Sequence, residues 1–170
     1  MLIIFGGLPG AGKTTTARAL AKELGAVHLR IDTIEQTIRA SGMLSSEVGP
    51  AGYMVGYRIA EDNLALGNIV VADSVNPLKV TRDAWLSVAA RSGAPAVEIE
   101  IICSDQAEHR RRVETRASDV AGLVKPNWEE VTARDYEDWG QSPITIDTAK
   151  QGVEEAVAEL MSKLGPGRRR

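Results

Sequence analysis

The sequence has little cysteine and no long run of apolar residues, and each shortage excludes a class of protein. Because Cys103 is its one cysteine, neither an internal disulfide framework nor a zinc site built from cysteines can form. Cys103 ends the apolar run Val97–Cys103, so we expect a buried thiol. The apolar start Met1–Phe5 is interrupted by two glycines and carries no basic leader, which argues against a signal peptide or a membrane span. We therefore expect a cytoplasmic protein without a membrane partner.

Basic residues are also in short supply. The chain has 20 Lys and Arg against 23 Asp and Glu, a formal net charge of −3. A general nucleic-acid binder usually has a strongly basic balance, so nucleic acid is not the favoured partner. Three arginines close the chain, and we expect residues 165–170 to form a flexible basic tail, with contact to nucleic acid as the alternative.

Short apolar runs alternate with longer stretches of helical spacing. A chain of 170 residues is the size of one domain, and we place that domain at residues 1–164. Runs that are apolar on both sides indicate a parallel α/β sheet with helices on both faces. The predicted strands are Leu2–Phe5, Ala26–Ile31, Ile69–Ala72, Val97–Cys103 and Ile144–Ile146.

Four stretches place apolar residues on one predicted helical face. Their sets are Ala17, Leu20 and Leu24; Ile59, Leu64 and Leu66, with a stop at Gly67-Asn68; Trp85, Val88 and Ala89; and Val153, Val157, Leu160 and Leu164.

The segment from Gly7 to Thr14 matches the phosphate-loop pattern G-x-x-x-x-G-K-[ST] in full, between a predicted strand and a predicted helix. Its glycines permit the tight backbone path that points N–H groups at a phosphate, and the helix adds its positive end. We expect Lys13 at the β- and γ-phosphates and the Thr14 hydroxyl on Mg²⁺, so ATP and Mg²⁺ are the predicted cofactors. The predicted nucleotide-binding residues here are Gly7, Pro9, Gly10, Ala11, Gly12, Lys13, Thr14 and Thr15.

A phosphate loop does not by itself separate a kinase from a GTPase, an ATPase motor or a nucleotide sensor. Asp32 follows the second predicted strand, where a carboxylate would be repelled by the γ-phosphate unless it had a task. One task is to accept the proton of an attacking hydroxyl. The alternative is a plain N-cap for the predicted helix Thr33–Arg39. Glu35, one turn on, would then contact the acceptor, whereas His28 in the strand is expected to be structural.

Asp73 follows the third predicted strand and precedes Ser74, Val75, Asn76 and Pro77. A carboxylate at this position can hold Mg²⁺ or an acceptor hydroxyl, so Asp73 is a candidate metal ligand and, with Asn76, a candidate substrate contact. The alternative is that these polar residues only cap the turn before the next helix.

Arg112 and Arg116 are four residues apart on a predicted helix, which would let both point at one object. A transferring phosphoryl group needs positive charge on its equatorial oxygens, which makes this pair a catalytic candidate. Gly122 and Pro126 mark the stretch behind it as a lid or hinge, and we place the lid at about residues 110–126. A solvated cationic face is the alternative.

These features together resemble the polynucleotide kinase and chloramphenicol phosphotransferase branch of P-loop kinases, over roughly residues 2–150. The resemblance implies a three-layer P-loop NTPase fold with a five-stranded parallel sheet in the order 2-3-1-4-5. It also implies Asp32 as general base and Arg112 and Arg116 as lid arginines. The segment Ile144–Thr148 resembles the part of these kinases that flanks adenine, which assigns Thr148 to the nucleotide.

The sequence departs from polynucleotide kinases at one position that bears on the acceptor. Phage-type polynucleotide kinases carry an arginine where this chain has Glu35, and a glutamate would repel a phosphate-bearing acceptor. We therefore expect a neutral or cationic hydroxylated small molecule. Tyr53 and Tyr57 share a helical face in the region expected to hold it, where they would stack on the substrate or pack in the core.

The sequence thus predicts an ATP-dependent kinase that phosphorylates a hydroxyl of a small molecule, acting as a monomer or homodimer. A kinase for 5′-hydroxyl nucleic acid or nucleotides is one alternative. A non-catalytic ATP-binding module or an ATPase is the other.

Overall fold

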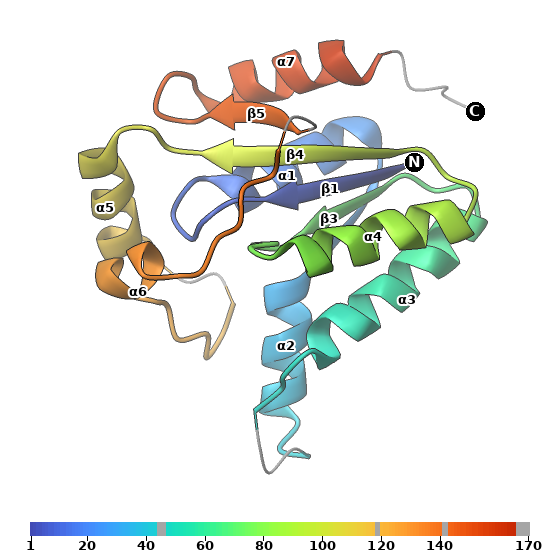
Figure 1. Ribbon diagram of the computed structural model, residues 1–170, viewed down its shortest axis with the longest axis horizontal. Coiled ribbons are helices and arrows are strands. Elements are labelled where there is room, and N and C mark those ends of the chain that lie inside the picture. Colours follow the sequence, from blue (N-terminus) through green and yellow to red (C-terminus); the bar gives the residue numbers. More distant parts are fainter. Residues whose placement is uncertain (44–46, 118–119, 141–142, 166–170) are drawn as a thin grey trace.

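The computed structural model describes residues 1–43, 47–117, 120–140 and 143–165, in which strands and helices alternate along the chain (Figure 1). The predicted basic tail falls mainly on residues 166–170, which lie outside the described residues, so its flexibility stays a prediction. The strands are β1 (Leu2–Gly6), β2 (Val27–Arg30), β3 (Val70–Asp73), β4 (Ala96–Ile102) and β5 (Ile144–Asp147). The helices are α1 (Lys13–Leu24), α2 (Ile31–Ala40), α3 (Ala51–Ala65), α4 (Lys79–Arg91), α5 (Gln106–Thr115), α6 (Trp128–Thr132) and α7 (Val153–Leu164).

The strands form one parallel sheet in the order β2-β3-β1-β4-β5, which confirms the predicted topology. The central strand β1 aligns Leu2 with Val70 of β3 on one side and with Ala96 of β4 on the other. Because parallel strands all end at the same edge, the segments that follow β1, β2 and β3 meet there. That edge therefore collects the phosphate loop, Asp32 and Asp73.

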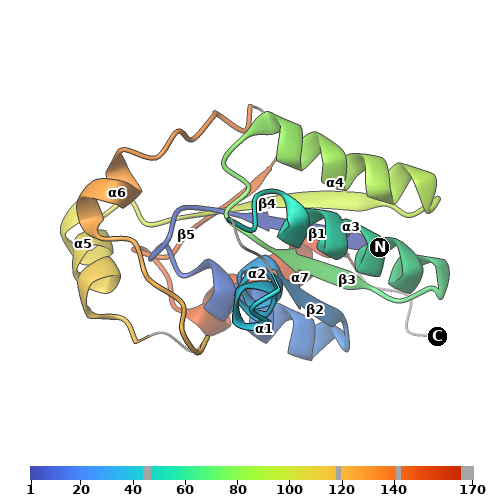
Figure 2. The same cartoon turned by 90° about the horizontal axis from the view of Figure 1, so that it is seen from below.

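Helices cover both faces of the sheet, as Figure 2 shows. Alternate residues of β1 supply the two cores: Ile3 and Phe5 pack in the cluster that contains α1 and α7, whereas Leu2 and Ile4 pack in the cluster that contains α3 and α4. All four side chains are fully buried. Because helices cover the sheet on both sides, both faces of β1 are buried, which explains why all of its residues are apolar or glycine.

The apolar faces predicted for the helices α1, α4 and α7 are confirmed. Leu20 of α1, Trp85 of α4 and Leu160 of α7 are fully buried. Cys103, directly after β4, is also buried, as its apolar surroundings predicted.

The face predicted for the helix before Gly67 was wrong. Ile59 and Leu66 are 39% and 79% exposed, and of the predicted set only Leu64 is buried. The buried face of α3 is instead Gly52, Gly56, Ala60 and Leu64. Small residues are needed because neighbouring elements lie close: a Cβ on Gly56 would come within 2.4 Å of the Ile31 Cδ1. A pattern of large apolar residues cannot reveal such a face.

The helix predicted at Thr33–Arg39 begins two residues earlier than expected. Helix α2 starts at Ile31, with Arg30 in the N-cap position and no side-chain capping bond. Asp32 therefore lies inside the first turn, and the alternative that it is a plain N-cap is not what the structure shows. Its carboxylate is left to face the edge of the sheet.

The segment predicted as a lid lies beside the carboxyl edge of the sheet. Helices α5 and α6 lie together there, joined by the chain between Arg116 and Asn127, of which residues 118–119 are outside the described part (Figure 1). Gly122 in this connection reaches α2, since a Cβ at that position would lie 2.7 Å from the Gln36 Nε2. Within the described ranges, the helices are all too short or too polar to cross a membrane.

Candidate active site

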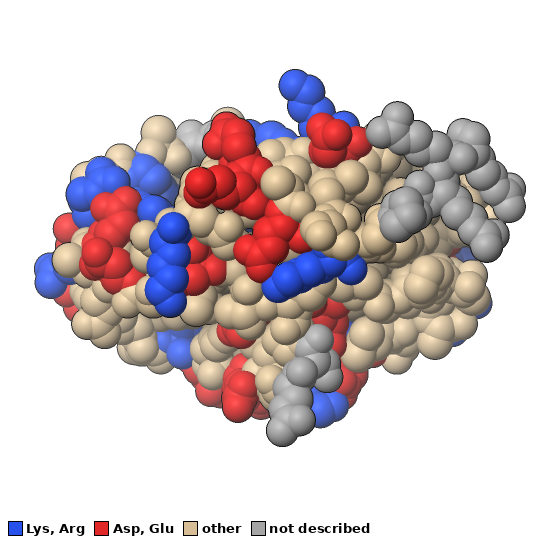
Figure 3. Space-filling view, turned by 90° about the horizontal axis from the view of Figure 1, so that it is seen from above, with Lys and Arg blue, Asp and Glu red and all other residues tan. Residues whose placement is uncertain are grey.

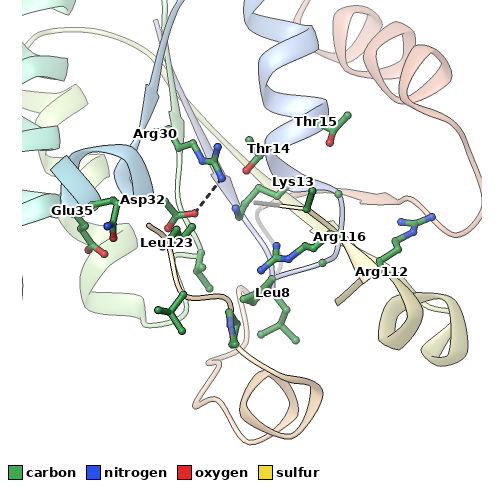
Figure 4. Close-up of a pocket in the computed structure, with 18 of the residues that line it drawn as sticks. Leu8, Lys13, Thr14, Thr15, Arg30, Asp32, Glu35, Arg112, Arg116 and Leu123 are labelled. Atoms are coloured by element: carbon green, nitrogen blue, oxygen red, sulfur yellow. Dashed lines mark ion pairs between the residues drawn. The ribbon is translucent and has the colours of Figure 1, made fainter. Parts of the chain in front are cut away.

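The phosphate loop between β1 and α1 lines a cavity of about 750 Å³ at the carboxyl edge of the sheet (Figure 4). Gly7, Gly10 and Gly12 have φ angles of 140°, 87° and 96°, a conformation that side chains with a Cβ rarely adopt. Gly7 also has no room for one, because a Cβ would lie 2.2 Å from the Ile101 carbonyl oxygen. The loop is thus shaped as the motif predicts.

Lys13 at the start of α1 is joined to Asp73 at the end of β3. The ammonium Nζ lies 3.1 Å from the Asp73 Oδ1, and the two side chains are 7% and 1% exposed. His28 approaches the other carboxylate oxygen, with its Nε2 3.2 Å from Oδ2. Burial alone would raise the pKa of Asp73, but the Lys13 charge and the His28 contact hold that pKa well below its ordinary range. Asp73 is therefore a carboxylate over the whole physiological range.

Thr14 and Asp73 bring two hard oxygen ligands together beside the phosphate loop. The Thr14 hydroxyl donates a weak hydrogen bond of 3.4 Å to the Asp73 Oδ1. A hydroxyl and a carboxylate suit Mg²⁺, which in phosphate sites takes few protein ligands and completes its shell with phosphate oxygens and water. In the described part of the chain, His, Cys, Asp and Glu form no group of three or more that could hold a metal by itself. The residues fit a magnesium ion that arrives with a nucleotide.

Asp32 and Glu35 line the opposite wall of the same cavity, on α2. Each carboxylate has an arginine near it: the Arg30 Nη2 lies 3.6 Å from Asp32, and the Arg39 Nη2 lies 3.7 Å from Glu35. Burial raises the pKa of Glu35, partly offset by the Arg39 charge. Figure 4 shows Asp32 facing the side of the cavity where Lys13 and Thr14 lie.

A second cavity of about 510 Å³ lies between α2, α3 and α4. Tyr53 and Tyr57 line it, as the shared helical face predicted. Their hydroxyls are tied to backbone: Tyr53 accepts a 3.4 Å bond from the Asn76 N–H, and Tyr57 donates a 3.2 Å bond to the Thr81 carbonyl. Among the described residues, those that line both cavities are Asp32, Glu35, Val75 and Arg134.

Asn76 does not reach either cavity. It is fully buried, its amide donates a 2.7 Å bond to the Phe5 carbonyl, and its carbonyl oxygen accepts a 3.2 Å bond from the Trp85 indole. Its φ of 47° is the one positive value at a non-glycine position in the described ranges. Asn76 therefore fixes the turn after β3, and Asp73, which is also absent from both linings, contacts Lys13 rather than open space.

Arg112 and Arg116 both line the phosphate-loop cavity, as the spacing of the pair allows, but their guanidinium groups lie in different parts of it. Helix α5 ends at Thr115, and Arg116 has left the helical conformation with ψ at 138°. The Arg112 guanidinium donates to the Thr148 hydroxyl at 2.8 Å and to the Thr148 carbonyl at 3.1 Å, while Arg116 points into the cavity (Figure 4). The two side chains are thus directed at different parts of the site.

Thr148 links this arginine to the phosphate loop. Its hydroxyl donates a 2.7 Å bond to the Ala11 carbonyl, and its methyl group lies 3.2 Å from the place of a Cβ on Gly12. Arg112, Thr148 and the phosphate loop therefore form one connected unit, and the assignment of the two residues to the nucleotide stays a prediction.

Several residues of the site were not predicted. Arg30, Arg39 and Arg134 all line the phosphate-loop cavity, and His109 of α5 places its Nε2 2.9 Å from the Pro9 carbonyl. Arg39 could have been found, since it lies four residues after Glu35 on one helix. Arg134 and His109 carry no local signal, because only the fold brings them to the phosphate loop.

The sheet order and the phosphate loop after β1 define this chain as a P-loop NTPase fold. Its sequence matches the family model described as AAA domain over residues 2–134, and the chain belongs to that family. Among curated proteins, none matches it in sequence.

Solved structures share the fold at low identity. Kti12 from Chaetomium thermophilum, in complex with ADP-AlF3, is 23% identical with a TM-score of 0.71, covering 96% of this chain and 97% of that chain. The APS kinase of Mycobacterium tuberculosis, in complex with AMPPNP and APS, is 19% identical with a TM-score of 0.70, covering 96% of each. A gluconokinase from Sinorhizobium meliloti is 19% identical with a TM-score of 0.62, covering 95% of this chain and 94% of that chain. These likenesses establish the fold.

Proposed function

We propose that this protein is an ATP-dependent kinase that transfers the γ-phosphoryl group to a hydroxyl of a small molecule, with Asp32 as general base. The observation that carries the proposal is the position of Asp32 on the border between two cavities. One cavity contains the phosphate loop, and the other has room for a second molecule. A base between nucleotide and acceptor is what transfer to a hydroxyl requires.

The similar structures support this choice. Two of them are described as kinases, and one of these holds AMPPNP and APS together. A protein of this fold that binds a nucleotide and a second small molecule together supports the assignment of two substrates to the two neighbouring cavities of this chain.

Each residue of the phosphate-loop cavity then has a task. The backbone N–H groups of the loop hold the β- and γ-phosphates, and Lys13 turns from Asp73 toward them. Thr14 and Asp73 would hold Mg²⁺, which when bound neutralises charge on the phosphate oxygens. Arg112 and Thr148 orient the nucleotide, and Arg116 adds positive charge to the equatorial oxygens of the transferring group.

Asp32 acts on the acceptor. Its carboxylate takes the proton of the acceptor hydroxyl as the oxygen of that hydroxyl bonds to the γ-phosphorus. The bond from the γ-phosphorus to the bridging oxygen of ADP breaks in the same step, and ADP carries away the electron pair. Glu35 and Arg134 lie beside Asp32 and would contact the acceptor.

The acceptor end of the site carries charges of both signs. Arg30 lies near Asp32 and Arg39 near Glu35, and Arg134 adds one further positive charge beside them. Figure 3 shows the face on the side of α7, away from the acceptor cavity, where acidic and basic side chains are interspersed without a continuous basic track for a phosphate backbone.

Transfer of ³²P from γ-labelled ATP tests the proposal. The purified protein with Mg²⁺ is expected to label at least one member of a panel of hydroxylated metabolites and antibiotics. Labelling of a 5′-hydroxyl oligonucleotide instead would establish the nucleic-acid kinase. ATP binding without transfer to any acceptor would count against both and favour a non-catalytic module.

A further inference from the structure

The second cavity has a polar end and an apolar end. Asp32, Glu35 and Arg134 stand at the end that joins the phosphate-loop cavity. Away from that border the walls are Pro50, Tyr53, Met54, Tyr57, Leu78 and Val80. A volume of about 510 Å³ lies within the roughly 300 to 1,000 Å³ typical of small-molecule sites.

The aromatic wall is formed by Tyr53 and Tyr57, and each hydroxyl already takes part in one hydrogen bond to backbone. Tyr57 stacks edge-on against Trp85, with ring centroids 4.5 Å apart, and Tyr53 lies 6.0 Å from Tyr57. Both tyrosine hydroxyls already bond to backbone of the turn after β3 or of α4. Burial is the main cause that raises the pKa of each phenol, so both remain neutral. A ligand here meets mainly ring faces, with the Ser74 hydroxyl and the O–H of Tyr53 as the polar groups of this wall.

The mouth of the cavity exposes apolar side chains to water. Met54 and Val80 are 63% and 68% exposed, and both belong to the lining. Large apolar residues exposed at the rim of a concave site are typical of surfaces that a ligand covers.

From these observations we propose that the acceptor is an amphipathic molecule, with its hydroxyl at Asp32 and an apolar, ring-sized body against Tyr53, Tyr57 and Val80. This inference rests on the proposed function, because it identifies the second cavity as the acceptor site. Sugars and other polyols are disfavoured as acceptors. Their hydroxyls would lose hydrogen bonds to water at the apolar end of the cavity and gain few in return. The apolar body supplies binding energy, while the polar end orients the reacting hydroxyl.

Two matched probes test the assignment, phenylethanediol and propanediol, which share a vicinal diol and differ in their apolar body. Binding to the whole chain with Mg²⁺ and AMPPNP is followed by ligand-observed NMR titration. Phenylethanediol is expected to bind at least about tenfold more tightly than propanediol. Equal affinity for the two diols would overturn the inference.

Val80→Asp supplies the mutational arm. It places a charge at the apolar rim in the first turn of α4, where an acidic residue suits the helix. It is expected to weaken phenylethanediol binding about tenfold. Leu66→Asp is the control, because Leu66 is 79% exposed and lines neither cavity. Unchanged binding in the folded Val80→Asp variant, checked by thermal unfolding, would also overturn the inference.

The kinase proposal and the cavity assignment fail differently. If phenylethanediol binds as expected but receives no phosphate from ATP, the cavity assignment stands and the result counts against the kinase. If both diols are phosphorylated with equal kcat/KM, the kinase stands and the cavity assignment is overturned.

Discussion

Lys13 and Asp73 form a buried ion pair, 3.1 Å apart and separated by 60 residues of sequence. The pair joins the phosphate loop to the end of β3. In it, the positive charge of Lys13 is neutralised by Asp73 rather than by a phosphate. Under the proposed function, Lys13 would exchange Asp73 for a phosphate of the nucleotide, so the strength of this pair bears directly on nucleotide binding.

We expect strong coupling between these two residues. In a double-mutant cycle of Lys13→Met and Asp73→Asn without nucleotide, the coupling free energy of unfolding should be about 1 to 3 kcal/mol, because each single change leaves a buried group unpaired. The exposed pair Lys79 and Asp83 is the control, with side chains 71% and 50% exposed. The same cycle there should give less than about 1 kcal/mol. Equal coupling at the two sites, measured by urea unfolding, would contradict the buried pair.

The same pair predicts a pH dependence. Because the folded pKa of Asp73 lies below its unfolded value, its contribution to stability is present above the unfolded pKa and is lost as pH falls toward the folded pKa. The difference in unfolding free energy between wild type and Asp73→Asn should not decline from pH 7 to 5. It should shrink below about pH 4. A difference that declines already between pH 7 and 5 would contradict the depressed pKa.

The two arginines of the predicted lid should have separable roles. Arg112→Gln is expected to weaken ADP binding about five- to tenfold, because it removes two bonds to Thr148 that hold the phosphate loop in place. Arg116→Gln should leave ADP affinity nearly unchanged and lower the rate of transfer about a hundredfold or more. Isothermal titration and single-turnover transfer measure the two quantities.

Arg110→Gln is the matched control for both arginines, since Arg110 is 54% exposed and pairs with Glu114, whereas Arg111 shares Glu108 with Arg112. It should change neither quantity. If Arg112→Gln and Arg116→Gln give the same pattern, the different directions of their side chains have no functional meaning.

The small-residue face of α3 makes a prediction about packing. Gly56→Ala should destabilise the protein by about 1 to 2 kcal/mol, because the clash with Ile31 outweighs the roughly 1 kcal/mol that alanine gains in a helix. Gly152→Ala is the control, with a φ of −77° and no atom closer than 3.8 Å to the new Cβ. Thermal unfolding compares the two. A more stable Gly56→Ala variant would show that α3 is not tightly packed there.

The fold was largely predictable because its signals are local. Each strand is a short apolar run, and the phosphate loop fixes which strand is β1. The face of α3 was not predictable in the same way. Gly52 and Gly56 are selected by how closely α2 and β2 approach, which no periodicity of large residues records.

The site was predictable where one motif or one strand end carries it, and not where distant segments meet. Lys13, Thr14, Asp32 and Asp73 are found from their places in the chain. The separation of Arg112 from Arg116 depends on where α5 ends, and element boundaries are weakly encoded. Arg134 lines the same two cavities as Asp32 although about a hundred residues separate them in the sequence, so only the folded chain shows that they share a site.

Phosphoryl transfer by Asp32→Asn tests most directly whether Asp32 is the general base. With the best acceptor from the panel, transfer should fall by about a hundredfold to ten-thousandfold, because the base is lost, while ADP affinity stays within about twofold. Asp62→Asn makes the same chemical change on an exposed part of α3 outside both cavities and should transfer at the wild-type rate. Transfer by Asp32→Asn at the rate of the Asp62→Asn control would contradict the central claim that Asp32 is the base of a kinase.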